Sequence, residues 1–172
     1  MPFWGFRPIP AAVRAVPLQP GDRRLAWSLT VEGEPVLASA YGLTLPGQEF
    51  LDWHLVEKAI WQRPQLIVQV VSQPVGVAHA AVIVEGAGAS CVLTLVPGGQ
   101  LPGVVRARVT DSVVWSRHLR FDQGGVRVVG RRQPGGRGFA WQLVYDRGTD
   151  VEDSRMRAEA DRALAAARQA VG

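Results

Sequence analysis

The chain has 172 residues, which is the length of one domain. Its apolar residues make up 47% and its charged residues 20%, a composition that excludes a disordered chain, a coiled coil and a collagen-like fibre. A chain of this length buries a sizeable core without a disulfide or a structural metal. The 19 glycines and 12 prolines supply the turns of a strand-rich protein.

Positive charge is concentrated in one part of the chain. All basic residues except Lys58 are arginine. Residues 104–147 contain nine arginines and three acids, which gives this segment a net charge of +6. The net charge of the whole chain is +4, so the remaining residues sum to −2. An asymmetry of this size can steer an anionic partner, although a solvated strand face is the commoner reason for exposed arginines.

The cysteine count and the hydropathy pattern indicate the cellular compartment to expect. Cys91 is the only cysteine in the sequence, which excludes an intramolecular disulfide, and its strand-like surroundings predict a buried, inert thiol. We find no secretory signal pattern and no uninterrupted apolar run of about 18 residues. The expectation is therefore a cytoplasmic protein without a transmembrane helix.

Residues 1–21 read as an N-terminal arm. Five of the prolines lie here, which argues against a regular helix or a central strand. The aromatic residues of the arm predict contact with the body of the protein or with a partner. Trp4 is the candidate partner contact, and the folded domain is expected to begin at residue 22.

The rest of the chain shows alternating or continuous apolar patterns between Gly- and Pro-rich turns, which predicts strands. Residues 50–61 suit either a strand or a helical turn. The strands are expected at residues 24–30, 36–45, 66–71, 75–84, 89–96, 112–121, 126–131 and 139–145.

Two helices are expected. A short helix of about three turns begins at Leu101, because Pro102 suits a first helical turn. Residues 152–170 predict a longer C-terminal helix, with acidic residues at its start and Arg168 near its end. Its apolar stripe consists of Met156, Ala160, Ala163, Leu164, Ala167 and Val171.

This order of elements predicts a mainly β (α+β) fold, an antiparallel small barrel or sandwich closed by the C-terminal helix. The phrases LQPGD at 18–22, VLASAYGLTL at 36–45 and LDWHLV at 51–56 resemble the first three strands of bacterial pleckstrin-homology-like domains. Asp22 replaces the glutamate frequent in those domains, and Asp52 stands where proline is frequent.

The whole chain also resembles a family of uncharacterised actinobacterial proteins. The matching phrases lie at 113–116, 131–135 and Trp141. The resemblance implies one pleckstrin-homology-like barrel over residues 22–172, with 152–170 as its helix. None of the matching phrases is catalytic, so the resemblance implies a fold and no activity.

The sequence offers no catalytic, cofactor-binding or metal site. His54, His79 and His118 are scattered and lack a ligand partner at helical or turn spacing. We find no Gly-x-Ser-x-Gly elbow, and the glycine-rich segments at 86–91 and 135–138 join strand to strand rather than opening a helix.

The main hypothesis is therefore a non-enzymatic binding or scaffold module that contacts an acidic protein or an anionic lipid surface. The absence of an RNP-like phrase and of a basic helix argues against nucleic acid. The candidate contact residues belong to a predicted hairpin, so that several of them share one face. They are Arg117, Arg120, Arg127, Arg131, Arg132 and Arg137.

The alternative hypothesis is a small-ligand carrier or an enzyme that uses a cavity inside the barrel. His54 or Asp52 would then lie at the mouth of a cavity of at least a few hundred Å³. A core filled by tryptophan side chains would argue against this alternative.

Overall fold

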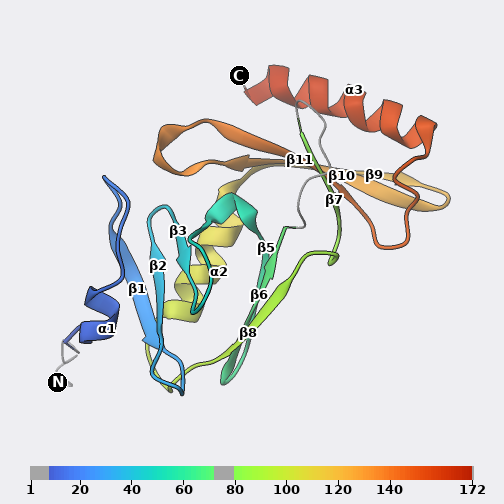
Figure 1. Ribbon diagram of the computed structural model, residues 1–172. Coiled ribbons are helices and arrows are strands. Elements are labelled where there is room, and N and C mark those ends of the chain that lie inside the picture. The colour runs from blue at the N-terminus through green and yellow to red at the C-terminus, as the bar shows by residue number, and fades with distance from the viewer. Residues whose placement is uncertain (1–7, 72–79, 172) are drawn as a thin grey trace, which may run out of the picture.

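The computed structural model describes residues 8–71 and 80–171, so Trp4 and His79 lie outside the described residues. Within these described residues, eleven strands form three sheets, and the longest helix lies toward the C-terminal end (Figure 1). The prediction of a mainly β fold with a C-terminal helix is therefore confirmed.

The first sheet is antiparallel and its strands follow the order of the chain. Its turns fall where glycine and proline predict them, at Gly33 and at Gly47, which both have positive φ angles. Residues 36–45 form two strands instead of the single expected strand, because the chain reverses at Ala40 and Tyr41. The strands are β1 (Arg24–Leu29), β2 (Pro35–Ser39), β3 (Gly42–Thr44) and β4 (Leu51–Asp52).

The second sheet has three antiparallel strands. A short 3₁₀ helix, η1 (Trp53–Leu55), leads into it from β4, so the ambiguous segment 50–61 contains both strand and helical turn. A single bridge between Thr30 and Leu95 joins its far end to the first sheet. The strands are β5 (Val56–Gln62), β6 (Gln65–Val70) and β8 (Ser90–Thr94).

Helix α2 (Leu101–Ser112) covers the core between these two sheets. Leu101 and Val105 are fully buried and pack with Leu43, Trp53 and Val56 in one apolar cluster. The helix expected from Leu101 onward is therefore confirmed, and its apolar face binds the first two sheets together.

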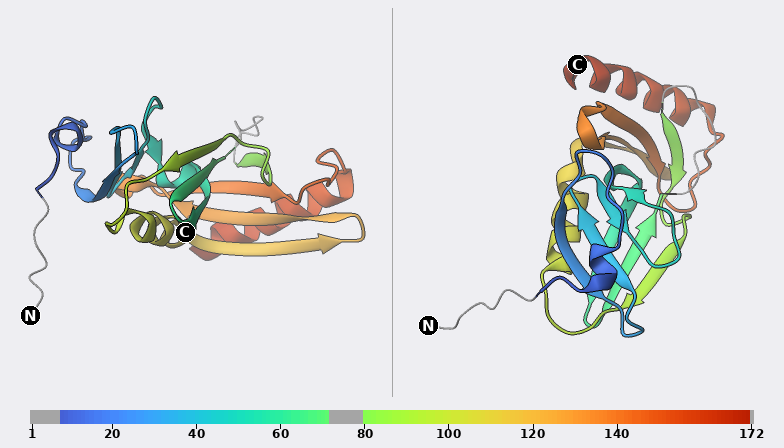
Figure 2. Two further views of the ribbon diagram at one scale, coloured as in Figure 1. Left: turned by 90° about the horizontal axis from the view of Figure 1, so that it is seen from below. Right: turned by 60° about the vertical axis from the view of Figure 1, so that its left-hand side comes forward.

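The third sheet has the order β7–β11–β10–β9, with β7 parallel to β11 and the other pairs antiparallel. Helix α3 (Ser154–Val171) lies across one face of this sheet (Figure 1 and Figure 2, right). On that face, Trp115 and Trp141 meet edge to face with ring centroids 6.1 Å apart. The strands are β7 (Ala81–Val84), β9 (Val113–Phe121), β10 (Gly124–Arg132) and β11 (Phe139–Tyr145).

The apolar stripe of α3 packs as predicted, but the helix closes no barrel. Met156, Ala160, Leu164 and Ala167 are buried against the third sheet, whereas the predicted barrel strands of the first two sheets are covered by α2. In residues 8–71 and 80–171 the three sheets form no closed barrel. The barrel prediction was wrong because neighbouring elements in the chain, such as β7 and β8, enter different sheets.

The N-terminal arm forms part of the fold from residue 11 onward. Helix α1 (Ala11–Arg14) follows Pro10, contrary to the expectation that the prolines exclude a helix. Pro10 precedes the helix, so it removes none of the helical hydrogen bonds. Fully buried Val13 packs with Leu37 on the outer face of the first sheet.

None of the helices in the described ranges is long and apolar enough to cross a membrane.

Candidate functional site

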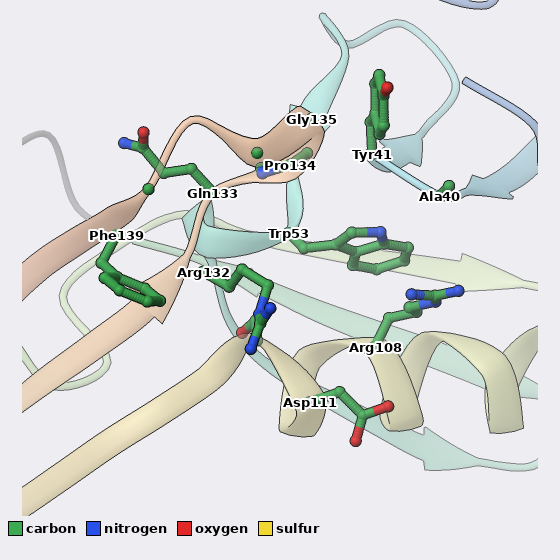
Figure 3. Close-up of a pocket in the computed structure, with 13 residues that line it drawn as sticks. Ala40, Tyr41, Trp53, Arg108, Asp111, Arg132, Gln133, Pro134, Gly135 and Phe139 are labelled. Atoms are coloured by element: carbon green, nitrogen blue, oxygen red, sulfur yellow. The ribbon is translucent and has the colours of Figure 1, made fainter. Parts of the chain in front are cut away.

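A pocket of about 420 Å³ lies where three separate parts of the chain meet (Figure 3). The end of α2 forms one side, the reversal between β2 and β3 forms another, and the connection between β10 and β11 forms the third. The residues that line it are Ala40, Tyr41, Trp53, Arg108, Asp111, Ser112, Arg132, Gln133, Pro134, Gly135, Gly136, Gly138 and Phe139.

Three aromatic side chains give the pocket its apolar walls. Trp53 is only 3% exposed, and its indole N–H donates to the carbonyl oxygen of Ser39 at 3.0 Å. Tyr41 is held by its backbone N–H, which donates to the Asp22 carboxylate at 3.1 Å. Phe139 is 38% exposed at the start of β11. The walls on the β2–β3 side are therefore fixed, while Phe139 remains open to solvent.

A glycine-rich loop completes the pocket between β10 and β11. Gly135, Gly136 and Gly138 have φ angles of 69°, 72° and 86°, a left-handed region that residues with a Cβ rarely adopt. The backbone N–H of Gln133 closes the loop by donating to the carbonyl of Gly138 at 2.8 Å. These glycines allow the loop to turn sharply beside Tyr41.

Two arginines bring positive charge to the pocket. Figure 3 shows Arg108 on the side where Trp53 lies and Arg132 on the side of Phe139. Neither guanidinium makes a hydrogen bond or an ion pair with another described residue. Asp111 also lines the pocket, so its charged side chains sum to +1. Both guanidinium groups retain donors that suit a carboxylate or a phosphate.

The six arginines of the predicted binding surface lie in different environments. Arg132 lines the pocket, and Arg137 donates to Asp52 at 3.2 Å and to the carbonyl of Pro134 at 2.9 Å. Arg131 is only 7% exposed. Its guanidinium donates to Gln142 at 3.2 Å, to the hydroxyl of Ser112 at 2.8 Å, and to the carbonyls of Val109 and Glu57. The guanidinium of Arg131 is thus engaged by four acceptors within the chain.

The other three arginines are exposed on the β9–β10 hairpin, but they do not share one face. Arg117 lies opposite Val128 in the register, and Arg127 lies opposite His118. Because side chains alternate along a strand, Arg117 lies on the face that carries α3, and Arg120 and Arg127 lie on the other face. The structure therefore divides the predicted surface into two sides.

Arg108 is the pocket residue that the sequence analysis missed. It belongs to α2, and the sequence shows it only as one of two arginines between the apolar positions of that helix. No local pattern indicates that the following hairpin brings Arg132 to the same pocket.

Asp52 and His54 form a cluster outside this pocket. The Asp52 carboxylate lies 3.2 Å from Arg137 and 3.9 Å from His54 Nδ1. Burial lowers the pKa of His54, an effect that the carboxylate of Asp52 partly offsets. With no closed barrel in the described residues, these side chains do not lie at the mouth of a barrel cavity. Nowhere in 8–71 and 80–171 do three His, Cys, Asp or Glu side chains gather as metal ligands would.

Comparisons add no relative to this description. No family model, no curated protein and no solved structure matches the chain. The functional argument therefore depends on the pocket and on the surfaces of the molecule.

Proposed function

We propose that the protein is a non-enzymatic binding module that captures an acidic residue of a partner protein in the pocket beside α2. The observation that carries this proposal is the pair of guanidinium groups, Arg108 and Arg132, that line an aromatic pocket without an ionic partner in the described chain. A carboxylate between them gains charge-assisted hydrogen bonds.

The walls indicate what accompanies the carboxylate. Trp53, Tyr41 and Phe139 offer apolar surface next to the charged groups. An aromatic or aliphatic side chain beside the acidic residue buries its surface against these rings, which favours binding by the hydrophobic effect. We therefore expect recognition of a short segment in which an acidic residue adjoins an apolar one.

The distribution of arginines favours a protein over an anionic membrane. A flat lipid surface is bound best by several basic residues that face the same way. The exposed arginines of the β9–β10 hairpin point to two opposite faces, because Arg117 and Arg120 are three residues apart on one strand. The pair at Arg108 and Arg132, which lines one pocket, suits a single side chain better.

We also propose that residues 22–112 form the pleckstrin-homology-like unit, with α2 as its helix. Support comes from the order of elements, a four-stranded and a three-stranded antiparallel sheet followed by a helix packed against both. Two of the three phrases of that resemblance, at 36–45 and 51–56, lie in this part of the chain, and the first phrase, at 18–22, ends where it begins. In this proposal α3 and strands β9, β10 and β11 are an addition to that unit, and β7 from within the unit pairs with β11.

A second candidate is a small anionic ligand, which the size of the pocket favours. Its volume of about 420 Å³ falls within the range of roughly 300–1,000 Å³ typical of small-molecule sites. The same arginines would bind such a ligand, so both candidates make the same prediction about Arg108 and Arg132. The two candidates differ in competition: a small-anion site binds a free anion more tightly than an acidic peptide, and a peptide site does not.

Binding of a fluorescein-labelled acidic tripeptide, N-acetyl-Phe-Glu-Glu, tests the proposal. The tripeptide is too short to pair along a strand, so it reports on the pocket. We expect Arg108→Gln/Arg132→Gln to weaken binding about tenfold, because two charge-assisted contacts are lost. Arg23→Gln/Arg155→Gln removes the same charge from exposed positions elsewhere and should change the affinity less than about twofold.

Three results would overturn the proposal. The first is equal loss of tripeptide binding in both double variants, since that result reflects net charge alone. The second is that the protein binds phosphatidylcholine–phosphatidylglycerol vesicles but not the tripeptide, and that only the Arg108/Arg132 variant loses the vesicle binding. The third is displacement of the tripeptide by inorganic phosphate at about a hundredfold lower concentration, which would assign the pocket to a small anion.

A further inference from the structure

The third sheet has one long edge that no strand in residues 8–71 and 80–171 pairs with. Strand β9 pairs with β10 on one side, and in the described part of the chain no strand pairs with its other side. Figure 2 (left) shows β9 along the outer border of the sheet, with the β9–β10 hairpin extending away from the N-terminal half. The edge comprises nine residues, long enough to hold an extended segment by backbone hydrogen bonds.

The hydrogen bonds of β10 show which residues of β9 point outward. The Gly125 carbonyl accepts from the N–H of Asp146, so Gly125 directs its backbone groups to β11. Alternate residues of an antiparallel strand bond to opposite neighbours. Val126 and Val128 therefore bond to β9, through Leu119 and Arg117. The residues of β9 that alternate with Arg117 and Leu119 direct their backbone N–H and C=O groups to the free edge. These residues are Ser116, His118 and Arg120.

The side chains give this edge a positive character. Residues 113–121 contain no acid and no proline, and the exposed arginines Arg117 and Arg120 point to opposite faces. Asp111 and Asp122 flank the strand in the sequence, and the Asp146 carboxylate lies 3.0 Å from His118. A strand laid against this edge thus meets a free guanidinium on each of its two faces.

We propose that the free edge of β9 binds an extended acidic segment of a partner protein, which joins the third sheet as a fifth strand. Backbone hydrogen bonds to Ser116, His118 and Arg120 hold the segment, as in other cases of strand addition. Carboxylates opposite Arg117 and Arg120 select an acidic sequence, and an apolar residue packs beside partly buried Leu119. This inference does not depend on the pocket beside α2.

The same charges disfavour a second copy of the chain as the occupant. Pairing two β9 strands brings four arginine side chains together, with no carboxylate on either strand. Like charges at paired positions destabilise a sheet, whereas opposite charges stabilise it. An acidic strand removes this repulsion, and a second copy does not.

Amide hydrogen exchange of the full chain tests the proposal with an acetylated peptide, Thr-Thr-Glu-Val-Val-Glu-Thr, whose two glutamates are three residues apart and therefore face Arg117 and Arg120 on opposite sides of the strand. We expect the amides of Ser116, His118 and Arg120 to exchange about tenfold more slowly when the peptide is bound. The amides of Arg117 and Leu119, which already bond to β10, should change little. This alternation distinguishes strand addition from contact through side chains.

A charge reversal provides the second measurement. The Arg117→Glu/Arg120→Glu variant should bind the acidic peptide at least about tenfold more weakly than the original chain does. It should instead bind the corresponding peptide in which lysine replaces glutamate. The matched control Arg23→Glu/Arg155→Glu should bind the acidic peptide within about twofold of the original chain. The Arg108→Gln/Arg132→Gln variant should still show slowed amide exchange at β9 when the peptide is bound. A negative result for the pocket therefore does not affect the inference about β9.

The inference is wrong if the peptide binds without protecting the three outward amides, or if the charge reversal leaves its affinity unchanged. It is also wrong if these amides are already protected in a dimer of the free protein, because a second copy then occupies the edge.

Discussion

The guanidinium of Arg131 lies 2.8 Å from the hydroxyl of Ser112, and this hydrogen bond joins β10 to the last residue of α2. The same guanidinium donates to the backbone of β5 at Glu57 and to Gln142 of β11. One side chain therefore connects the third sheet to the core covered by α2. It also fixes the position of the neighbouring residue, Arg132, at the pocket.

Replacing Arg131 with leucine is expected to destabilise the fold by about 2–4 kcal/mol. The change leaves buried acceptors on Gln142, Ser112 and Glu57 without their donor, and unsatisfied buried groups are costly. Urea unfolding measures the loss. The control is Arg127→Leu, an exposed arginine four residues away on the same strand, which should change stability by less than about 0.5 kcal/mol. Equal effects of the two substitutions would refute the structural role of Arg131.

Leu164→Ala in α3 is expected to cost about 2–4 kcal/mol, because it removes buried apolar surface and leaves a cavity beneath the helix. Ala160 is fully buried, so Ala160→Leu should also destabilise by overpacking. Arg162 pairs with Glu159 at 2.6 Å on the exposed side, and Arg162→Ala should cost no more than about 0.5 kcal/mol. Thermal unfolding ranks the three variants. An unchanged melting temperature for Leu164→Ala would show that α3 does not stabilise the third sheet.

The stability of the protein should fall as the pH drops below the ordinary pKa of histidine. Burial lowers the pKa of His54 in the folded state below its ordinary value of about 6.5, so the unfolded chain takes up the proton first. The stabilisation is therefore present above pH 6.5 and lost as the pH falls toward the lowered pKa. Unfolding curves from pH 7.5 to 5 measure this dependence, and His54→Gln should make it shallower. Identical slopes for the two proteins would contradict the effect of burial on His54.

Local patterns account for the elements that were predicted correctly. The stripe from Met156 to Ala167 repeats at helical spacing, and Asp122 with Gly124 marks the β9–β10 turn, because both signals depend only on near neighbours in the chain. The burial of Arg131 depends on Ser112 and Glu57, which come from other elements. Alternation alone cannot show that the end of α2 lies beside Arg131.

The pocket was beyond prediction for the same reason. Tyr41, Arg108 and Arg132 come from parts of the chain that no repeat or spacing relates. Each has an ordinary local explanation, as a turn residue, a helix surface residue and a strand end. Only the placement of α2 against the first sheet brings them together.

The guanidinium resonances of the pocket test the central proposal most directly. In side-chain ¹⁵N spectra of the full chain, titration with N-acetyl-Phe-Glu-Glu should shift the Nε signals of Arg108 and Arg132 along one saturable curve. The Nε signals of Arg23 and Arg155 should stay in place. If the tripeptide binds and the signals of Arg108 and Arg132 do not move, the pocket is not the site that recognises an acidic residue.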